Sequence, residues 1–333
     1  MKRLIILLLV LATIACEMSA RDRINFDKGW RFALVDSVQM SSPEYDDAAW
    51  RLLNVPHDWA IEGDFSASAP SGNSGGALPG GIGWYRKTFN VDKADEGKQL
   101  YIDFDGVYMN AKVWINGTLL GQRPYGYSSY RYDLTPYIIY GGKNVVAVRV
   151  DNSDQPNSRW YSGCGIYRHV WLNKTHMVHV AHWGTHVVAE GNKVKVDVTV
   201  DNPDNVKFTV RNILLDREGR AVGKSTGLKS VIKVGKPRLW SCESPYVYTV
   251  KTEILVGGNV VDTYTTTTGF RTFKFDAAKG FSLNGKSMKI NGVCQHHDLG
   301  CLGAALNEDA LHRQLRILKE MGVNAVRCSH NPP

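Results

Sequence analysis

The sequence lacks an apolar stretch of the roughly 20 residues that a membrane-spanning helix needs. Its amino terminus instead joins a short basic segment, Met1–Arg3, to an apolar run over residues 4–15. This pattern is typical of a secretory signal peptide in residues 1–20, with cleavage after Ala20. The alternative is a lipid anchor on Cys16, as at a bacterial lipoprotein site. Both options predict an exported protein, periplasmic or associated with the outer membrane, without a transmembrane span.

Cysteine is scarce. Of six cysteines, one lies in the apolar leader segment, and an odd number at scattered positions makes a poor disulfide framework for a large exported protein. We therefore expect free, buried thiols at the other five, which are Cys164, Cys242, Cys294, Cys301 and Cys328.

A run of basic residues is also missing, although the formal net charge is +8. The 40 Lys and Arg residues are spread along the chain among 32 Asp and Glu residues. A mixed, solvated surface explains this distribution better than a polyanion partner does, so nucleic-acid binding is not expected. Low-complexity sequence is confined to one glycine-rich stretch, and disorder is therefore not expected either.

Residues 21–173 are dense in short segments in which apolar and polar residues alternate. Examples are 100–107, 111–115 and 144–150. Period-two alternation with Gly, Asn and Pro between the segments predicts an antiparallel sandwich. Asn116-Gly117 is typical of a two-residue hairpin turn, because both positions tolerate positive φ. The glycine-rich loop at 66–81 interrupts this domain, and we expect it to be too flexible to pack as core.

A second run of short strands extends over residues 174–276. Lys193–Val200 alternates strictly, and strands are also expected at 208–215 and 247–256. About a hundred residues of this kind are typical of an immunoglobulin-like sandwich, although the paired cysteines of antibody domains are absent. Nothing in the segment suggests chemistry, so we interpret it as a spacer.

The hydrophobic period changes in residues 277–333. A strand is expected at Lys289–Val293, then a helix from Asn307 to Met321, and another strand at Val323–Val326. Asn307 is a suitable N-cap and Gly322 a suitable helix end. A strand–helix–strand unit of this kind predicts the beginning of an α/β domain.

Polar residues cluster where the two expected strands of this unit end, at 294–298 and 327–330. One interpretation is a metal site, in which Cys294, His296, Cys301 and Cys328 supply the ligands, although their spacing matches no paired-cysteine site. Another is a thiol–imidazole pair formed by Cys328 and His330. A third is a rim of hydrogen-bonding groups around a hydroxyl-rich ligand. Ordinary buried polar residues are the alternative to all three, and two clusters at equivalent strand ends weaken it.

Several motifs in fixed order resemble family 2 glycoside hydrolases, most closely the exported bacterial β-galactosidases. The resemblance covers nearly everything after the apolar leader. The motifs that are similar to the family's barrel, amino-terminal jelly roll and middle domain are Val293–Gly300, Met321–Pro333, Pro56–Trp59, Gly83–Phe89, Val113–Gly117, Tyr125–Tyr127, Tyr132–Thr135, Arg159–Arg168 and Gly269–Arg271.

The resemblance implies a multidomain chain: a jelly-roll sandwich (21–173), an immunoglobulin-like β-sandwich (174–276) and the beginning of a truncated (β/α)8 TIM barrel (277–333). It implies retaining hydrolysis of a terminal β-linked sugar by two glutamates on later barrel strands, beyond Pro333. Glu308 and Glu320 cannot replace them, since both lie on the expected helix. No catalytic residue is expected in these 333 residues. We expect the chain alone to be inactive and its leucine-rich helix face to be exposed.

The same resemblance implies that His296, Asp298, Arg327 and His330 contact or orient the sugar. Asp accepts hydrogen bonds from adjacent hydroxyls, whereas His can donate or accept. Strand alternation should turn His297 away from its neighbours. The jelly-roll loop with Arg159 and Trp160 can approach the pocket, and a buried Trp is the alternative.

The implied substrate is a β-linked oligosaccharide or polysaccharide. β-Glucuronidase, β-mannosidase and a non-catalytic carbohydrate-binding protein are the alternatives to β-galactosidase. The non-catalytic alternative predicts an exposed aromatic platform in the sandwich. No cofactor is expected in this part of the chain; the resemblance allows metal ions in a full-length protein, and a homo-oligomer.

Overall fold

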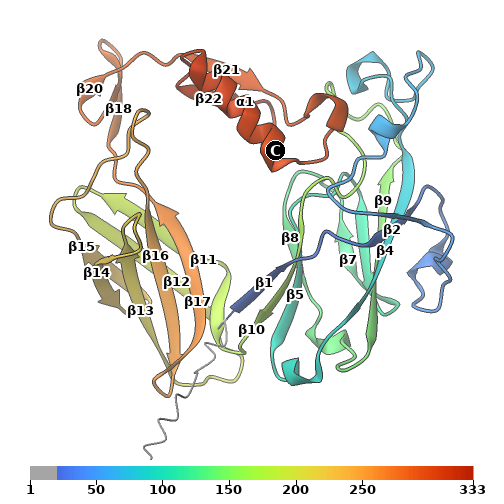
Figure 1. The fold of residues 1–333 in the computed structure, drawn as a ribbon, viewed down its shortest axis with the longest axis horizontal. Helices are drawn as coiled ribbons and strands as arrows, with labels where there is room; N and C mark the ends of the chain where they lie inside the picture. Colours follow the sequence, from blue (N-terminus) through green and yellow to red (C-terminus); the bar gives the residue numbers. More distant parts are fainter. Residues whose placement is uncertain (1–20, 333) are drawn as a thin grey trace, which may run out of the picture.

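The computed structural model describes residues 21–332, so the leader segment with Cys16, and Pro333, lie outside the described residues. Three parts follow one another along the chain (Figure 1): a large sandwich, a smaller sandwich, and a short strand–helix–strand unit that lies above and between them. Two β-sandwiches followed by a parallel strand–helix–strand unit are the parts that the sequence predicted, in the predicted order.

The large sandwich consists of two antiparallel sheets. One has the order β1-β10-β5-β8 and the other the order β3-β2-β4-β9-β6-β7. The strands are β1 (Arg21–Asn25), β2 (Trp30–Ala33), β3 (Arg51–Leu53), β4 (Gly81–Asn90), β5 (Gln99–Phe104), β6 (Ala111–Ile115), β7 (Thr118–Arg123), β8 (Tyr130–Asp133), β9 (Lys143–Asn152) and β10 (Val170–Thr175). Alternate residues of both sheets, among them Trp30, Leu100 and Val148, are fully buried between them.

The predicted hairpin turn at Asn116-Gly117 joins β6 to β7, with φ of 47° and 82° at the two residues. The loop at 66–81 differs from its prediction. Ser71 is buried, and its hydroxyl accepts from the backbone N–H of Leu78 at 3.1 Å and donates to the Leu78 carbonyl at 2.7 Å. These bonds fold the loop back on itself and place Leu78 in the core, so the expectation that the loop is too flexible to pack is wrong.

The second sandwich has sheets of order β11-β12-β15 and β14-β13-β16-β17. The strands are β11 (His179–Glu190), β12 (Lys193–Asp201), β13 (Phe208–Leu215), β14 (Ala221–Thr226), β15 (Lys229–Lys233), β16 (Tyr248–Val256) and β17 (Asn259–Thr268). Valine, leucine and isoleucine side chains fill the space between the sheets. A hairpin sheet of β18 (Phe273–Asp276), β19 (Gly280–Leu283) and β20 (Lys286–Ser287) follows, and the predicted boundary at residue 276 falls inside it.

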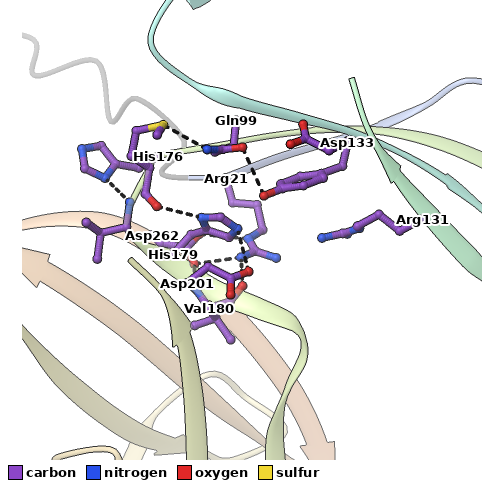
Figure 2. Close-up of polar contacts among 12 residues, drawn as sticks. Arg21, Gln99, Arg131, Asp133, His176, His179, Val180, Asp201 and Asp262 are labelled. Carbon is purple, nitrogen blue, oxygen red and sulfur yellow. Dashed lines mark hydrogen bonds and ion pairs between the residues drawn. The ribbon is translucent and has the colours of Figure 1, made fainter. Parts of the chain in front are cut away.

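One buried ion pair joins the two sandwiches. Figure 2 shows Arg21 of β1 beside Val180 and Asp262 of the second sandwich. The Arg21 guanidinium donates to both carboxylate oxygens of Asp262, each at 2.9 Å, and to the Val180 carbonyl at 2.7 Å. The Val180 N–H donates to Asp262 at 2.7 Å, and the Asp262 side chain is fully buried. The first strand of one domain is thereby tied to the second domain.

The third part contains β21 (Gly292–Gln295), the helix α1 (Glu308–Glu320) and β22 (Ala325–Cys328), with the two strands parallel. The helix is as predicted: Asn307 accepts from the Ala310 N–H, and Gly322 follows with φ of 85°. The strands begin two to three residues later than expected. Asn324 is the physical reason, because its amide group binds the Lys289 carbonyl and the Asn291 N–H and so occupies the backbone groups of a ladder there.

The exposure of this unit corrects one prediction and agrees with another. Only Cys164 is buried among the five described cysteines; Cys242 is half-buried, and Cys294, Cys301 and Cys328 are exposed. All five are free thiols, but the expectation of burial is wrong for the three in the strand–helix–strand unit, because no other described element covers them. No residue of α1 is buried, as expected for its apolar face.

Candidate functional site

The predicted site residues His296 and His330 meet at one edge of the parallel strand pair. Each follows the carboxyl end of a strand, β21 or β22, and parallel strands end at the same edge. Their ring centroids are 5.7 Å apart with the rings at 78°. The Ser329 N–H donates to the Gln295 carbonyl at 2.8 Å, which holds the two strand ends together. Both histidines are exposed.

A loop of the large sandwich reaches this edge. The Trp160 ring lies 4.6 Å from the ring of His330, and its indole N–H donates to the Tyr127 hydroxyl at 2.9 Å. The Tyr125 hydroxyl donates to Asn331 at 3.1 Å. Trp160 is half-buried rather than enclosed in the core, so one wall of the candidate site comes from the jelly roll.

Asp298 and Arg327 take different places around this edge. Asp298 is half-buried, and its charge acts on Tyr161, whose pKa is raised chiefly by burial and further by nearby carboxylates. Arg327 lies within β22 and not after it; it donates to the Ser329 hydroxyl at 2.6 Å and contacts the Cys294 sulfur at 3.8 Å. Hydrogen bonds from Ser329 and Arg327 lower the pKa of the Cys294 thiol. Arg327 therefore orients the strand ends, whereas His330 lies against Trp160 of the jelly roll and Asp298 acts on Tyr161 of the same domain.

His297 points away from its neighbours, as strand alternation predicts. It is buried against the rings of Tyr127 and Tyr167, at 5.4 and 6.2 Å, and its Nε2 lies 3.5 Å from the Ser162 carbonyl oxygen. Burial lowers the pKa of His297. A neutral His297 thus packs the strand–helix–strand unit onto the jelly roll.

Asp58 is a residue that sequence reasoning missed, although it lies in the quoted motif Pro56–Trp59. Its buried carboxylate accepts from the backbone N–H groups of Ala60 at 3.0 Å, Cys164 at 2.8 Å and Ala304 at 2.9 Å, and from the Tyr161 hydroxyl. Burial raises the pKa of Asp58. One side chain thereby joins two jelly-roll loops to the turn after β21.

Close approach around Asp58 requires glycine. A Cβ added at Gly303 would lie 2.4 Å from the Asp58 carboxylate, and one at Gly163 2.7 Å. Both glycines also have positive φ, 58° and 72°. The sequence signal for this junction is limited to an acidic residue within the motif Pro56–Trp59 and to glycines far along the chain.

The metal interpretation of the cluster finds no support in the geometry, whereas the pairing of Cys328 with His330 stays a hypothesis. Within residues 21–332, no group of three or more His, Cys, Asp or Glu side chains is arranged to hold a metal ion. The expectation that no cofactor binds here stays a prediction. The same residues include no helix of sufficient length and apolarity to cross a bilayer.

Three family models match the chain, and their boundaries agree with those of the two sandwiches and the strand–helix–strand unit. Residues 25–176 match the sugar binding domain of glycosyl hydrolases family 2, residues 178–271 match the domain described as glycosyl hydrolases family 2, and residues 276–333 match the TIM barrel domain of that family. The three matches cover both sandwiches and the strand–helix–strand unit.

Individual proteins similar to this chain are named as glycosidases. A β-galactosidase of Bacteroides ovatus is 55% identical over 95% of this chain and 39% of its own length. A putative β-glucuronidase of Formosa agariphila is 44% identical over 98% of this chain and 33% of its own length. The chain thus spans between a third and two fifths of these curated relatives.

Solved structures have the same fold. A β-glycosidase of Bacteroides vulgatus superposes with a TM-score of 0.89 at 42% identity, covering 93% of this chain and 42% of that one. A family 2 glycosyl hydrolase of Bacteroides cellulosilyticus also gives a TM-score of 0.89, at 38% identity. With matching domains in the same order from residue 25 onward, and the polar cluster at the strand ends where barrel enzymes carry their sites, this chain belongs to glycosyl hydrolase family 2.

Proposed function

We propose that this chain is the amino-terminal part of a retaining β-galactosidase that removes terminal β-linked sugars from oligosaccharides or polysaccharides. The observation that carries the proposal is the meeting of His296 and His330, 5.7 Å apart, at the carboxyl ends of two parallel strands. Retaining hydrolysis places two carboxyl groups about 5–5.5 Å apart across the glycosidic bond. In the proposed enzyme, later barrel strands supply both.

The described residues contribute the part of the pocket that grips the sugar ring. His296, Asp298 and His330 offer donors and acceptors to adjacent hydroxyls, and Trp160 offers a flat apolar wall. Hydrogen bonds to hydroxyls that strengthen in the transition state raise the rate as well as the affinity. Arg327 acts as a positioning residue through Ser329.

Galactose is favoured over glucuronate as the sugar. The relative with 55% identity carries the name β-galactosidase, and the one with 44% identity is described as a putative β-glucuronidase. A pocket for a uronate would need a cation facing the sugar carboxylate. Arg327, the arginine of the cluster, is instead bound to Ser329 and directed at Cys294.

The test uses the complete open reading frame and the nitrophenyl β-glycosides of galactose, glucuronate and mannose. We expect the highest kcat/KM with the galactoside, and a loss of about 100-fold, or ~3 kcal/mol, in the variant His330→Ala. His312→Ala is the matched control, because His312 is exposed on α1. Preference for another glycoside, or equal activity of both variants, would refute the assignment.

A second measurement isolates the contribution of this part of the chain. Residues 1–333 alone should not hydrolyse the galactoside, since the proposed glutamates lie on later strands. Robust turnover by residues 1–333 would contradict that placement of the catalytic groups.

We also propose that the protein is exported, on the basis of the basic and apolar segments in residues 1–15. Labelling of cells with radioactive palmitate distinguishes the two forms of export. Label that disappears in Cys16→Ser indicates a lipid anchor, whereas an unlabelled protein that begins after Ala20 indicates a cleaved signal peptide. Retention in the cytoplasm would refute both.

A further inference from the structure

A cavity of about 410 Å³ lies where the two sandwiches meet. This volume is within the range of about 300–1,000 Å³ that is usual for small-molecule sites. Its walls come from both domains: Arg23, Asp105 and Arg131 from the jelly roll, and Trp183, Tyr264 and Thr265 from the second sandwich. The cavity shares no lining residue with the polar cluster at His296 and His330.

A distortion of β11 carries Trp183 into this cavity. Val180 pairs with Val200 and Thr185 with Val198, so the four residues from Ala181 to Gly184 bulge out of the ladder between them. Gly184 is required there, because an added Cβ would lie 2.7 Å from the Thr199 carbonyl oxygen. Bulges often direct a side chain toward a site.

Trp183 itself adopts an unfavourable backbone conformation. Its φ is 53°, in the left-handed region that bulky residues rarely adopt. The indole is 66% exposed and stacks on His182, with ring centroids 4.3 Å apart and the planes at 27°. A large aromatic side chain is therefore held in water at a cost in both backbone strain and hydration, and such strain is common at ligand sites.

Most of the charged groups around the cavity are held by opposite charges or by an aromatic ring. Arg131 forms a two-bond ion pair with Asp103 at 2.6 and 2.8 Å, as Arg21 does with Asp262. Arg23 lies 3.7 Å over the Trp171 ring, whose N–H donates to Asp105 at 2.8 Å. The lining thus contains three arginines and two aspartates, and a third aspartate, Asp262, is buried beside it and paired with Arg21. With Asp262 counted, the arginine and aspartate charges are equal in number, and the cavity offers many fixed hydrogen-bonding groups.

Two polar atoms in the wall, His182 Nε2 and the Tyr130 hydroxyl oxygen, have no hydrogen-bond partner within residues 21–332. Both atoms are buried. Buried polar atoms are usually satisfied, so an unpaired nitrogen in a cavity wall is a place for a ligand hydroxyl.

We propose that this cavity, a cleft between the two sandwiches, binds a neutral β-linked oligosaccharide, with one pyranose ring stacked on Trp183. The flat faces of β-linked pyranoses carry C–H bonds that pack on an aromatic ring, and their hydroxyls need the alternating donors and acceptors that this cleft supplies. Its near-zero net charge favours a neutral chain over a polyanion. The inference does not depend on the hydrolase activity proposed above, because binding in the cleft needs no bond cleavage.

The test is calorimetric titration of the full chain with cellohexaose and with a galactan-derived hexasaccharide. We expect binding of at least one of them with a Kd below about 1 mM, weakened about tenfold or more in Trp183→Ala. Trp183→Phe should retain most of the affinity, because it keeps an aromatic face. Phe65→Ala is the control, since Phe65 is 72% exposed and lies elsewhere on the jelly roll. Thermal unfolding of each variant confirms that it is folded.

Three outcomes would overturn the inference. The first is the absence of binding by either neutral hexasaccharide, and the second is equal affinity of the parent and Trp183→Ala. The third is tighter binding of an anionic chondroitin hexasaccharide.

Discussion

At the scale of single residues, Asp58 shows how one buried charge can organise a site. Taking a carboxylate out of water is costly unless hydrogen bonds compensate. Here three backbone N–H groups and the Tyr161 hydroxyl all donate to it. Since these donors belong to separate loops, the carboxylate holds the turn after β21 against the jelly roll, and with it the position of His296.

The first prediction concerns Asp58→Asn. The asparagine side chain places an NH2 group where one carboxylate oxygen now accepts two hydrogen bonds. Because an NH2 group donates, two of the four hydrogen bonds are lost. We expect the free energy of unfolding to fall by about 2–4 kcal/mol, measured by chemical denaturation. The control is Asp64→Asn, a change at an exposed position nearby. Unchanged stability in Asp58→Asn would mean that the carboxylate is not needed for the junction.

At the scale of elements, turn residues and helix caps were predictable because they act locally. Asn116-Gly117 forms the expected turn, and Asn307 caps the expected helix. The ends of β21 and β22 were not predictable to the residue. Their register depends on Asn324, whose amide binds backbone groups of residues 289 and 291, more than thirty positions away in the chain.

The second prediction tests a turn. Asn116 donates to the Tyr137 carbonyl at 2.8 Å and to Asn144 at 2.9 Å, and accepts from the Val145 N–H at 2.8 Å. Asn116→Ala removes these bonds and leaves alanine at positive φ, so unfolding should become easier by about 2–3 kcal/mol. Thermal denaturation against Thr118→Ala, an exposed neighbour in the same hairpin, provides the measurement. Similar melting of the two variants would contradict the prediction.

At the scale of the whole molecule, the contact between the sandwiches depends on Arg21 and Asp262. Their side chains are 11% and 0% exposed, so water screens this pair little. The pair also satisfies the Val180 N–H and carbonyl. The cleft that holds Trp183 borders this contact, and its shape therefore depends on how the two domains meet.

The third prediction is that Asp262→Ala destabilises the chain by about 3–5 kcal/mol, because it leaves a buried guanidinium without its counter-charge. Denaturant titration is the measurement. Glu190→Ala serves as the control, since it removes a solvent-exposed ion pair with Lys195 and should leave the midpoint unchanged. Equal effects of the two substitutions would show that the domains are held together by other contacts.

The fourth prediction concerns pH. Burial lowers the pKa of His57, His179, His182 and His297 from the ordinary value of 6.5. For each, the unfolded chain takes up a proton before the folded one does, so stability is present above pH 6.5 and is lost as the pH falls through the folded pKa. His169 acts in the opposite direction, because its hydrogen bond to Asp27 raises its pKa.

Because burial lowers the pKa of these four histidines, the free energy of unfolding should decrease as the pH is lowered from 7.5 to about 5.5. His179→Gln should reduce this slope, because His179 is buried. Denaturant titrations across the range test both statements. Rising stability toward acid pH would show that His169 dominates.

The class of the protein was determined by the sequence itself. Alternating periods, turn residues, one capped helix and ordered motifs are local signals, and they were sufficient for two β-sandwiches followed by the start of a barrel. Only the tertiary structure decided which side chains meet. His330 and Trp160, Asp58 and Ala304, and Arg21 and Asp262 are each more than 150 positions apart, and no local pattern encodes their contacts. Such contacts form only when separately folded elements bury their apolar faces together, because that packing fixes the loops and strand ends between them.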